Sequence, residues 1–496
     1  MLTIEEIKQF IDNDHTREKK QHAITGQRYY EGEHEILKYK LYYVDADGKL
    51  QEDKYRSNIR ISHPFFTELV DQQVQYMLSG ENGIIRSDIP ELQEMLDTYF
   101  DDDFYSEVYE LLTGAVSKGF EYMYAYKNEQ GRTAFQCADS IGVVEVRAKD
   151  TDDKCEYFIY WYVDRVEKGQ QKINRIQVWD KSQVYFFVQD GEGKIERDDT
   201  VSLNPAPHVI EVDTKGNKYG AELGYIPFFR LDNGRKQFSG LKPIKELIDD
   251  YDLMACSLSN NLQDFTDAIY VVAGFQGDNL DELIENVKVK KHIGVDADGS
   301  VDVKTVNIPY QARQTKLDLD EKNIYRFGMG FNSAQIGDGN ITNIVIKSRY
   351  ALLDLKCNKL EIRLRQFLRK ILQIVLDEIN EQNGTDYQMK DIKLEFEREV
   401  MTNAQDNAQI ELTDAQKQQV QINNLLSLSN ILDDETIIQQ ICDILDIDYE
   451  EIKDKLPVKE EENTEQAEQM LNGIIPDNSG GDAIEPETKD STASAP

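Results

Sequence analysis

Two Asp-Ala-Asp-Gly sequences, which begin at Asp45 and Asp296, are the residues whose types and spacing best suit ion binding. Alternating carboxylates followed by a glycine form part of a calcium-binding loop, where oxygen atoms surround the ion. Both copies lack an acidic residue at the first position of such a loop and a glutamate at the twelfth. They therefore predict two hairpin turns rather than calcium sites.

Other catalytic patterns do not occur in the sequence. It has no phosphate-binding Gly-x-x-x-x-Gly-Lys-Ser/Thr loop and no Gly-x-Ser-x-Gly elbow, and His34-Glu35 is not followed by the second histidine of a zinc protease. The six histidines are scattered, and a single one such as His63 or His292 is more often a surface or hydrogen-bonded residue than a ligand. Because no pair of carboxylates stands out, we expect no enzyme activity and no cofactor.

The charge of the chain limits how it can meet nucleic acid. Its 496 residues include 93 acidic and 56 basic side chains, which give a net charge of −37. Proteins that grip nucleic acid by neutralising phosphates need clustered Lys and Arg. Any contact with DNA is therefore expected to be sparse or repulsive.

Length and cysteine content indicate the general class of protein. The chain is long enough for about three domains of ~150 residues. Its five cysteines are far apart and odd in number, which favours a reducing cytoplasm over a disulfide framework or a zinc site. No apolar run approaches the ~20 residues of a membrane span, so we expect no membrane partner.

The first half of the chain predicts helices followed by a sheet. Thr3 and Glu6 form a capping-box pattern, and helical apolar spacing recurs over 64–80 and 92–116. From Tyr122 to Arg230 the pattern alternates and is rich in aromatic and β-branched residues, which predicts an antiparallel sheet built of hairpins. The run YFIYWYV is apolar on both faces, so both faces of this sheet should be covered.

The order of elements between Gly240 and Ile379 is the most informative feature. A 3-4 apolar stripe over 241–270 predicts a helix, a β-rich insert follows, and a second helix leads to a loop rich in Gly and Asn. A helix of roughly 35 residues, about 50 Å long, then begins near Val345. No single globular core needs this order, and it suits a subunit that packs around a ring.

The long helix also concentrates positive charge. Its apolar residues follow strict 4-3 steps from Ile346 to Ile374. In so acidic a chain, a basic helix is most simply a partner for acidic surfaces of its own or an adjacent subunit, and direct DNA contact is the alternative. The side chains assigned to this subunit packing are Lys356, Arg363, Arg365 and Arg369.

Three further segments complete the chain. The sequence IKLEFE at 392–397 alternates like a strand that returns to the sheet, and 401–455 has helical spacing. Residues 456–496 are acidic, contain Ser, Gly and Pro, and lack a periodic apolar face, which predicts disorder.

Several motifs resemble those of one family, the portal proteins of tailed bacteriophages of the SPP1-like siphophage type. YYEGEHEIL at 29–37 is similar to a Y-x-G-x-H-x-I-L stretch of the family, and the helix that follows Pro64 resembles a helix of the family that ends in Y-x-x-G, although here Gly80 comes four residues after Tyr76. The best match is the run from Gly224 to Gly274, with its Leu-Ile-Asp-x-Tyr-Asp core. Thr342-Asn343 stands where the family has Ser-Gly, and the likeness covers about residues 25–400.

The resemblance implies an α+β, multidomain, ring-forming portal fold with wing, stem, clip and crown regions around a DNA channel. Carried onto this chain, the parts are a wing (1–240), a first stem helix (241–270), a clip (271–310), a second stem helix (311–331), a tunnel loop (332–344), a long wing helix with a returning strand (345–400), a helical crown (401–455) and the acidic tail (456–496).

The resemblance also implies roles for individual residues. In the tunnel loop, the channel-lining residues would be Asn332, Ser333, Gln335, Gly337, Asp338, Gly339, Asn340, Thr342 and Asn343. In the clip, the residues contacting the terminase or an adaptor protein would be Asn279, Glu282, Lys288, Lys290, Lys291 and Lys304.

The implied protein is a ring of normally twelve subunits at one capsid vertex, assembled in the host cytoplasm and carried in the virion. Its implied partners are further copies of itself, the major capsid protein and scaffold, the terminase large subunit, a head-completion or adaptor protein, and double-stranded DNA in the channel. Net acidity fits this role, because a wall that does not bind phosphates lets DNA slide.

Two other functions remain open from the sequence. Another structural head or head-tail connector protein would share the acidity and helicity but would not need the order of helix, insert, helix, loop and long helix. A metal-dependent DNA-processing enzyme would need a carboxylate cluster, and the sequence singles out none.

Overall fold

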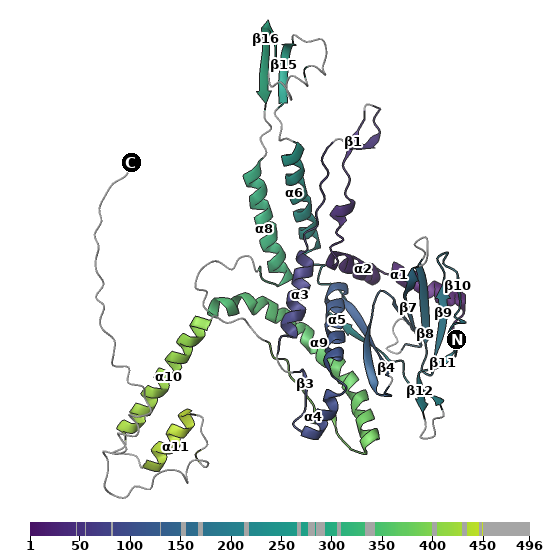
Figure 1. Cartoon of the computed structure of the whole chain (residues 1–496), viewed down its shortest axis with the longest axis vertical. Coiled ribbons are helices and arrows are strands. Elements are labelled where there is room, and N and C mark those ends of the chain that lie inside the picture. Colours follow the sequence, from purple (N-terminus) through teal and green to yellow (C-terminus); the bar gives the residue numbers. More distant parts are fainter. Residues whose placement is uncertain are drawn as a thin grey trace. The chain divides into compact units, whose positions relative to one another are not determined.

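The computed structural model combines helices and antiparallel sheets, as the α+β prediction requires (Figure 1). The chain divides into two compact units, residues 1–402 and 403–496. The structure describes residues 1–45, 47–54, 56–80, 83–128, 130–149, 155–166, 172–212, 218–264, 269–275, 283, 293–304, 309–332, 343–398, 404–428, 434–445 and 449.

Five helices of the first unit precede its main sheets. The predicted capping box is confirmed, because the Thr3 hydroxyl accepts from the backbone N–H of Glu6 and the Glu6 carboxylate accepts from that of Thr3. The helices are α1 (Ile4–Thr16), α2 (Glu18–Tyr30), α3 (Phe65–Met77), α4 (Pro90–Asp97) and α5 (Asp102–Lys118), with a short 3-10 turn, η1 (Glu35–Lys38), after α2.

The predicted antiparallel hairpins form, but they make several sheets rather than one. A three-stranded sheet has the order β14-β4-β5, and a six-stranded sheet has the order β10-β9-β8-β7-β6 with β11 beside β9. The strands are β4 (Phe120–Lys127), β5 (Thr133–Ala138), β6 (Val143–Val146), β7 (Tyr157–Val166), β8 (Lys172–Trp179), β9 (Gln183–Gln189), β10 (Ile195–Arg197), β11 (Ala206–Pro207), β12 (Val209–Val212), β13 (Lys218–Ala221) and β14 (Phe228–Asp232), and β12 pairs with β13.

The six-stranded sheet is covered on both faces within the chain. Ile7 of α1 packs with Ile159 and Ile176 on one face. Phe158 and Trp179 pack with aromatic residues of the three-stranded sheet on the other. The predicted two-sided cover is therefore confirmed for this part of the sheet, although Val166 at the end of β7 is 61% exposed.

The segment predicted as stem and clip consists of two helices that enclose a β-hairpin. They are α6 (Lys245–Asp264) and α8 (Tyr310–Gly328), and the hairpin between them pairs β15 (Ile269–Phe275) with β16 (Val295–Lys304). The first helix was predicted to reach residue 270, which is wrong: its β-branched end belongs to β15, where Ile269 pairs with Lys304. The second helix also starts and ends earlier than the predicted 311–331.

The long helix α9 (Asn343–Asn383) has 41 residues, more than the roughly 35 predicted. It packs with α3, α5 and the three-stranded sheet in the largest core, where Leu353, Leu364 and Ile379 are fully buried. A 3-10 turn, η4 (Met389–Asp391), and a short strand, β17 (Lys393–Leu394), follow. Contrary to prediction, β17 does not return to the main sheet, because it pairs with β3 (Ile85–Arg86).

The second unit contains α10 (Ala404–Ser427) and α11 (Asp434–Leu445), in agreement with the predicted helical region. The two helices contact each other, and the side-chain amide of Gln418 donates to the backbone carbonyl of Ile444 at 3.3 Å. Ile437 and Cys442 of α11 are buried. The predicted disordered tail, 456–496, lies outside the described residues.

Candidate functional site

Helices α6 and α8 are joined by a polar contact as well as by apolar packing. Lys316 of α8 reaches Asp250 of α6 at 2.5 Å and also bonds Asp320 of its own helix. Burial opposes the charged form of Lys316, but its hydrogen bonds to these two carboxylates outweigh burial and raise its pKa. The ion pair fixes how α8 sits against α6, and Ile248 and Ile324 are fully buried in the same core.

A fully buried carboxylate attaches α6 to the N-terminal region. Asp252 lies 2.6 Å from Nδ1 of His34 and 2.7 Å from Nδ1 of His63, and it accepts the His63 backbone N–H at 3.0 Å. Burial acts to raise the pKa of Asp252, but the hydrogen bonds from both histidines exceed that effect and hold the pKa below its usual value. The His34 ring stacks on Tyr29 with centroids 4.5 Å apart.

A second cluster lies beside this carboxylate at the base of α6. The hydroxyl of Tyr29 donates to Asp249, and Lys245 contacts Asp249 at 2.7 Å and Glu35 at 3.0 Å. Burial and the neighbouring carboxylate together raise the pKa of Tyr29. These groups bind the first turns of α6 to α2 and η1 through charged hydrogen bonds.

Sequence reasoning missed the cluster of His34, His63 and Asp252, because it treated the two histidines as scattered residues. The three side chains come from distant parts of the chain and meet only in the fold. A usable signal was the four-residue spacing of Asp252, Cys256 and Asn260, which places polar groups on one face of α6. None of the described residues forms a group of three His, Cys, Asp or Glu side chains suited to a metal ion.

The segment entering the predicted tunnel loop is fixed on α3. The Gln72 side chain donates to the Phe331 carbonyl at 2.9 Å and accepts the Phe331 N–H at 3.3 Å. A Cβ at Gly330 would lie 2.3 Å from the end of the Leu69 side chain, so any other residue there would force that side chain to move. Asn332 donates to Glu321, which ties the start of the predicted loop to α8.

The structure describes only the two ends of the predicted tunnel loop. Asn332 lies at its start, whereas Asn343 is the first residue of α9, so the predicted boundary at 344 is wrong. The other loop residues lie outside the described part: Ser333, Gln335, Gly337, Asp338, Gly339, Asn340 and Thr342. Of the clip residues, Lys304 ends β16, and those outside the described part are Asn279, Glu282, Lys288, Lys290 and Lys291.

Two acidic residues of α9, Asp354 and Glu361, are engaged within the chain. Arg365 contacts Glu361 at 2.8 Å, donates to the Leu394 carbonyl at 2.6 Å and stacks on the Phe396 ring. Arg398 contacts Asp354 at 2.5 Å and also pairs with Glu361. Arg365, which was predicted to pack against another subunit, therefore makes three contacts inside its own chain.

The remaining predicted cations of α9 differ from Arg365. Lys356 and Arg363 are half-buried and Arg369 is exposed, and none has an ion pair among the described residues. Burial lowers the pKa of Lys356 to about 8. Leu355 and Ile362 are 60% and 62% exposed on the same helix. We call the side of α9 that carries Lys356, Arg363, Arg369, Leu355 and Ile362 its outer face.

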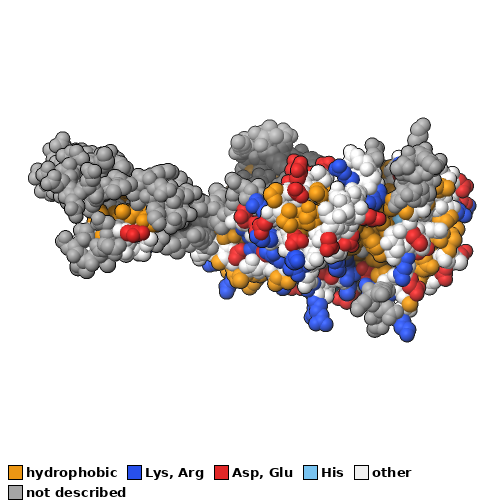
Figure 2. Space-filling model, turned by 90° about the horizontal axis from the view of Figure 1, so that it is seen from below, with side chains coloured by type: hydrophobic (Ala, Val, Ile, Leu, Met, Phe, Trp, Pro, Cys, Tyr) orange, Lys and Arg blue, Asp and Glu red, His pale blue; other side chains and the backbone are white. Residues whose placement is uncertain are grey.

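Charges of both signs are intermixed on the surface that Figure 2 shows, the molecule seen from below. Lys and Arg side chains lie next to Asp and Glu and next to exposed apolar groups. A protein that holds DNA firmly gathers its cations into one patch. The face drawn in Figure 2 therefore suits contacts with another protein better than a firm grip on phosphates.

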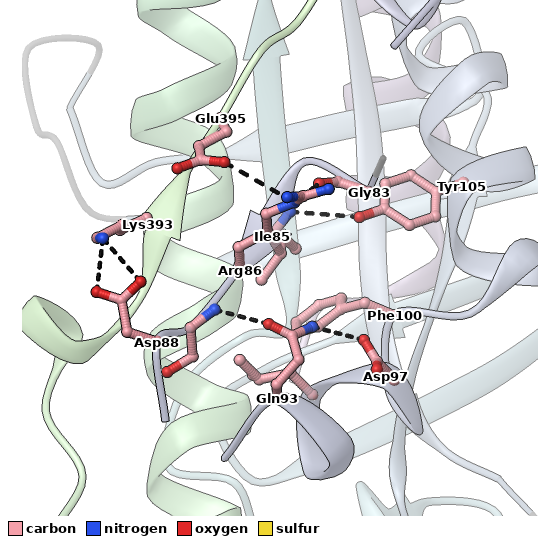
Figure 3. Close-up of a pocket in the computed structure, with 12 residues that line it drawn as sticks. Gly83, Ile85, Arg86, Asp88, Gln93, Asp97, Phe100, Tyr105, Lys393 and Glu395 are labelled. Carbon is pink, nitrogen blue, oxygen red and sulfur yellow. Dashed lines mark hydrogen bonds and ion pairs between the residues drawn. The ribbon is translucent and has the colours of Figure 1, made fainter. Parts of the chain in front are cut away.

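A cavity of about 470 Å³ lies where β17 joins β3, near α4 (Figure 3). Lys393 pairs with Asp88, and Gln93 accepts the Ser87 N–H at 2.6 Å while donating to Asp97 at 2.7 Å. Its polar side chains thus bond to one another. The Lys393–Asp88 pair holds β17, which follows α9, against the segment that precedes α4.

Comparisons with known proteins agree with one another. The family model described as phage portal protein, SPP1 Gp6-like, matches residues 8–466. The portal protein of Bacillus phage SPP1 is 29% identical over 348 residues, which cover 70% of this chain and 68% of that protein. The portal protein of Clostridium phage phiCD119 is 25% identical over 424 residues, which cover 82% of this chain and 89% of that protein.

Proposed function

The chain belongs to the SPP1 Gp6-like family of phage portal proteins, and on this premise we propose that its copies form a ring, normally of twelve, through which double-stranded DNA enters and leaves a capsid. The family match across residues 8–466 carries this proposal. The order of α6, β-hairpin, α8 and α9 supports it, because extended elements of this kind need neighbours to cover them. The ring would be a virion component at one capsid vertex, assembled in the host cytoplasm.

We assign the parts of the ring with boundaries adjusted to the observed elements. The stem is α6 and α8, the clip is β15, β16 and the chain between them, and the tunnel loop lies between Asn332 and Asn343. The wing comprises residues 1–240 together with α9, the crown contains α10 and α11, and the acidic tail follows. The fixed contact between Gln72 and Phe331 supports the loop assignment, since a loop that meets moving DNA needs a firm base.

We assign the channel a passive electrostatic role. DNA carries one negative charge per about 1.7 Å of its axis, so a basic wall would hold it by releasing counterions. A chain with a net charge of −37 avoids this and lets the duplex slide in both directions. No catalytic step is assigned to this chain, and ATP hydrolysis would belong to a separate terminase.

We assign the outer face of α9 to packing between neighbouring copies. Its cations have no carboxylate partner among the described residues. The apolar side chains of Leu355 and Ile362 beside them are mostly exposed. An acidic surface of the next copy would supply both charge pairing and apolar cover. The further partners are the major capsid protein and scaffold at the wing and crown, and the terminase large subunit and head-completion protein at the clip.

The mass and shape of the purified full chain test this function. Twelve copies of the 57.2 kDa chain would weigh about 690 kDa, and negative-stain images should show rings with a central hole. A species of 57.2 kDa at high protein concentration would overturn the proposal. A head-tail connector would also form a ring, but both relatives found are portal proteins, which favours the portal.

Shortening the loop tests the channel assignment separately. Removing residues 335–341 should leave ring assembly intact while impairing DNA packaging or retention, because the loop is assigned to DNA rather than to subunit contacts. Assembly can be followed by images of rings, and packaging by nuclease-protected DNA in capsids. Loss of the ring with normal folding of the free chain would contradict the loop assignment.

A further inference from the structure

A basic groove lies beside the second half of α9, where the chain turns back through η4 to β17. Its volume is about 320 Å³. Three cations line it, Arg365, Arg369 and Lys390, together with four apolar side chains, among them Leu372 and Ile392. Within the described part of the chain, no acidic residue lines this groove. It therefore offers positive charge and apolar surface side by side.

The groove differs in charge from the cavity that Figure 3 shows. In that cavity Lys393 pairs with Asp88 and Arg86 pairs with Glu395, so its charges balance one another. The basic groove is lined by cations without a matching set of carboxylates. In a chain with 93 acidic and 56 basic side chains, such a site attracts negatively charged ligands.

The three cations of the groove have different tasks. Arg365 is held in place, because it contacts Glu361 and donates to the Leu394 carbonyl. Arg369 and Lys390 are exposed and have no ion pair among the described residues. An arginine guanidinium and a lysine ammonium both form strong hydrogen bonds with carboxylates. These two side chains are therefore available for an acidic ligand.

The apolar part of the groove limits the kind of anion that fits. Leu372 and Ile392 are buried, at 1% and 8% exposure, and Met389 is half-buried beside them. Methionine adapts its shape to the group that it contacts. An inorganic anion or a DNA phosphate would meet the cations but leave this apolar surface uncovered. The groove therefore suits a peptide in which carboxylates flank large apolar side chains.

The groove is continuous with the outer face of α9, because Arg369 belongs to both. The outer face is assigned to packing against the next copy, and Leu355 and Ile362 are mostly exposed on it. A neighbouring copy that covers these side chains also lies next to the groove. A second copy of this chain is therefore the partner that reaches the groove.

One segment of the sequence has the required composition. Residues 460–475, EEENTEQAEQMLNGII, contain five glutamates and no basic residue. Four large apolar residues follow the glutamates: Met470, Leu471, Ile474 and Ile475. The segment lies outside the described residues. Its five negative charges are opposite in sign to the three cations of the groove.

Two other acidic segments match the groove less well. Residues 88–103 contain seven acidic residues and no basic one, but Leu92 and Leu96 of this segment are buried in the core of their own chain. Residues 278–291 contain four acidic residues, and the three lysines that follow them in the same segment cancel most of their charge. The segment 460–475 therefore matches both the charge and the apolar surface of the groove better than either.

We propose that the basic groove binds the acidic segment 460–475 of a second copy of this chain. Carboxylates of the segment bond to Arg369 and Lys390, and its apolar side chains lie on Leu372 and Ile392. Pairing of this kind reduces the repulsion between copies that each carry a net charge of −37. The proposal rests on the ring of the proposed function and names a contact that joins its copies.

Photo-crosslinking in mixed rings tests this contact. Unlabelled full-length copies with benzoylphenylalanine at Met470 are assembled together with heavy-isotope copies that lack the photo-reactive group. Links should join the unlabelled segment to heavy peptides within residues 365–394 and give products of at least twice the 57.2 kDa chain mass. Links within single chains alone, or to heavy peptides outside the groove alone, would overturn the proposal.

A charge reversal in the groove gives the matched comparison. Lys390→Glu lies in the groove but not on the outer face of α9, so it should lower the crosslink yield about tenfold while rings still form through the other subunit contacts. Lys181→Glu, at an exposed lysine in the turn between β8 and β9, is the control and should leave the yield unchanged. Equal yields from both variants would overturn binding in the groove.

The crosslink yield in wild-type rings separates this contact from the proposed function. Rings that form without a link from residue 470 to the groove would overturn the contact alone. A wild-type chain that stays a single copy at high concentration would overturn the proposed function and this contact with it.

Discussion

The buried side of α6 and the outer face of α9 use charge in opposite ways. On α6, Asp252 is enclosed and receives three hydrogen bonds from His34 and His63. On α9, Lys356 and Arg369 have no ion pair within the described part of the chain. A charge whose partners lie in the same chain holds the fold together, whereas an unpaired charge in an acidic chain is available for a neighbour.

Removing the buried charge on α6 is the strongest test of this contrast. Asp252→Asn should lower the free energy of unfolding by about 3 kcal/mol, because it breaks a buried charged network. The measurement is urea unfolding of the unassembled chain, and Asp318→Asn on the exposed side of α8 is the control, with an expected change within about 0.5 kcal/mol. Equal effects for the two variants would mean that the bonds of Asp252 to His34 and His63 do not stabilise the fold.

The pH dependence of the same group has a definite sign. The folded-state pKa of Asp252 lies below its unfolded value, so its contribution is present above the unfolded pKa of about 3.9 and is lost as pH falls through the folded value. The stability difference between wild type and Asp252→Asn should therefore shrink below about pH 4. A difference that stays constant down to pH 2 would contradict the assignment.

Placing a negative charge on the outer face of α9 should act on assembly rather than on folding. Ile362→Asp introduces a carboxylate beside the cations of α9 that, in our proposal, contact acidic surfaces of the next copy. The assembled fraction should fall about tenfold, equivalent to about 1.4 kcal/mol. Mass photometry measures it, and Val166→Asp, at a side chain of nearly equal exposure, is the matched control. Equal losses for both variants would show that added charge alone disrupts the ring.

Helices α6 and α9 also show which structural features could be predicted from the sequence. The 4-3 pattern of α9 correctly predicts burial of Leu353 and Leu364, because the position of an apolar stripe depends on local spacing. It fails near the end, where Ile374 is half-buried and Val375 and Ile379 are fully buried. A straight helix has 3.6 residues per turn, so a strict 3.5-residue repeat drifts off its buried face.

Partners between distant segments could not be read from the sequence. The pattern on α6 continues to Ile269, but pairing with Lys304 turns that end into a strand. His34, His63 and Asp252 meet only through tertiary folding. Similarly, Arg365 and Arg369 look alike in the sequence, yet Glu361 and the Leu394 carbonyl engage only the first.

Loss of the contact that anchors the predicted tunnel loop should lower the free energy of unfolding less than Asp252→Asn does. Gln72→Ala removes two hydrogen bonds to Phe331 and should cost about 1 kcal/mol, mostly as local opening. Hydrogen exchange at the Phe331 amide should accelerate about fivefold. Gln75→Ala, at an exposed position on the same helix, should leave this exchange unchanged, and equal acceleration in both variants would contradict the anchoring role.

The smallest expected effect concerns Lys356 of α9, which is half-buried and has no ion pair among the described residues. Its folded-state pKa is lowered to about 8 by burial, against about 10.4 in an unfolded chain. Between these values the unfolded chain binds more protons, so this group makes the free chain more stable as pH rises. Lys356→Met removes that dependence on pH. In urea unfolding, the variant should be the more stable protein at pH 7, and its advantage in free energy of unfolding should narrow as the pH rises to 10. An acidic partner from the next copy would raise the pKa again, so the narrowing should weaken in assembled rings. An identical narrowing in both forms would place Lys356 outside the subunit contact.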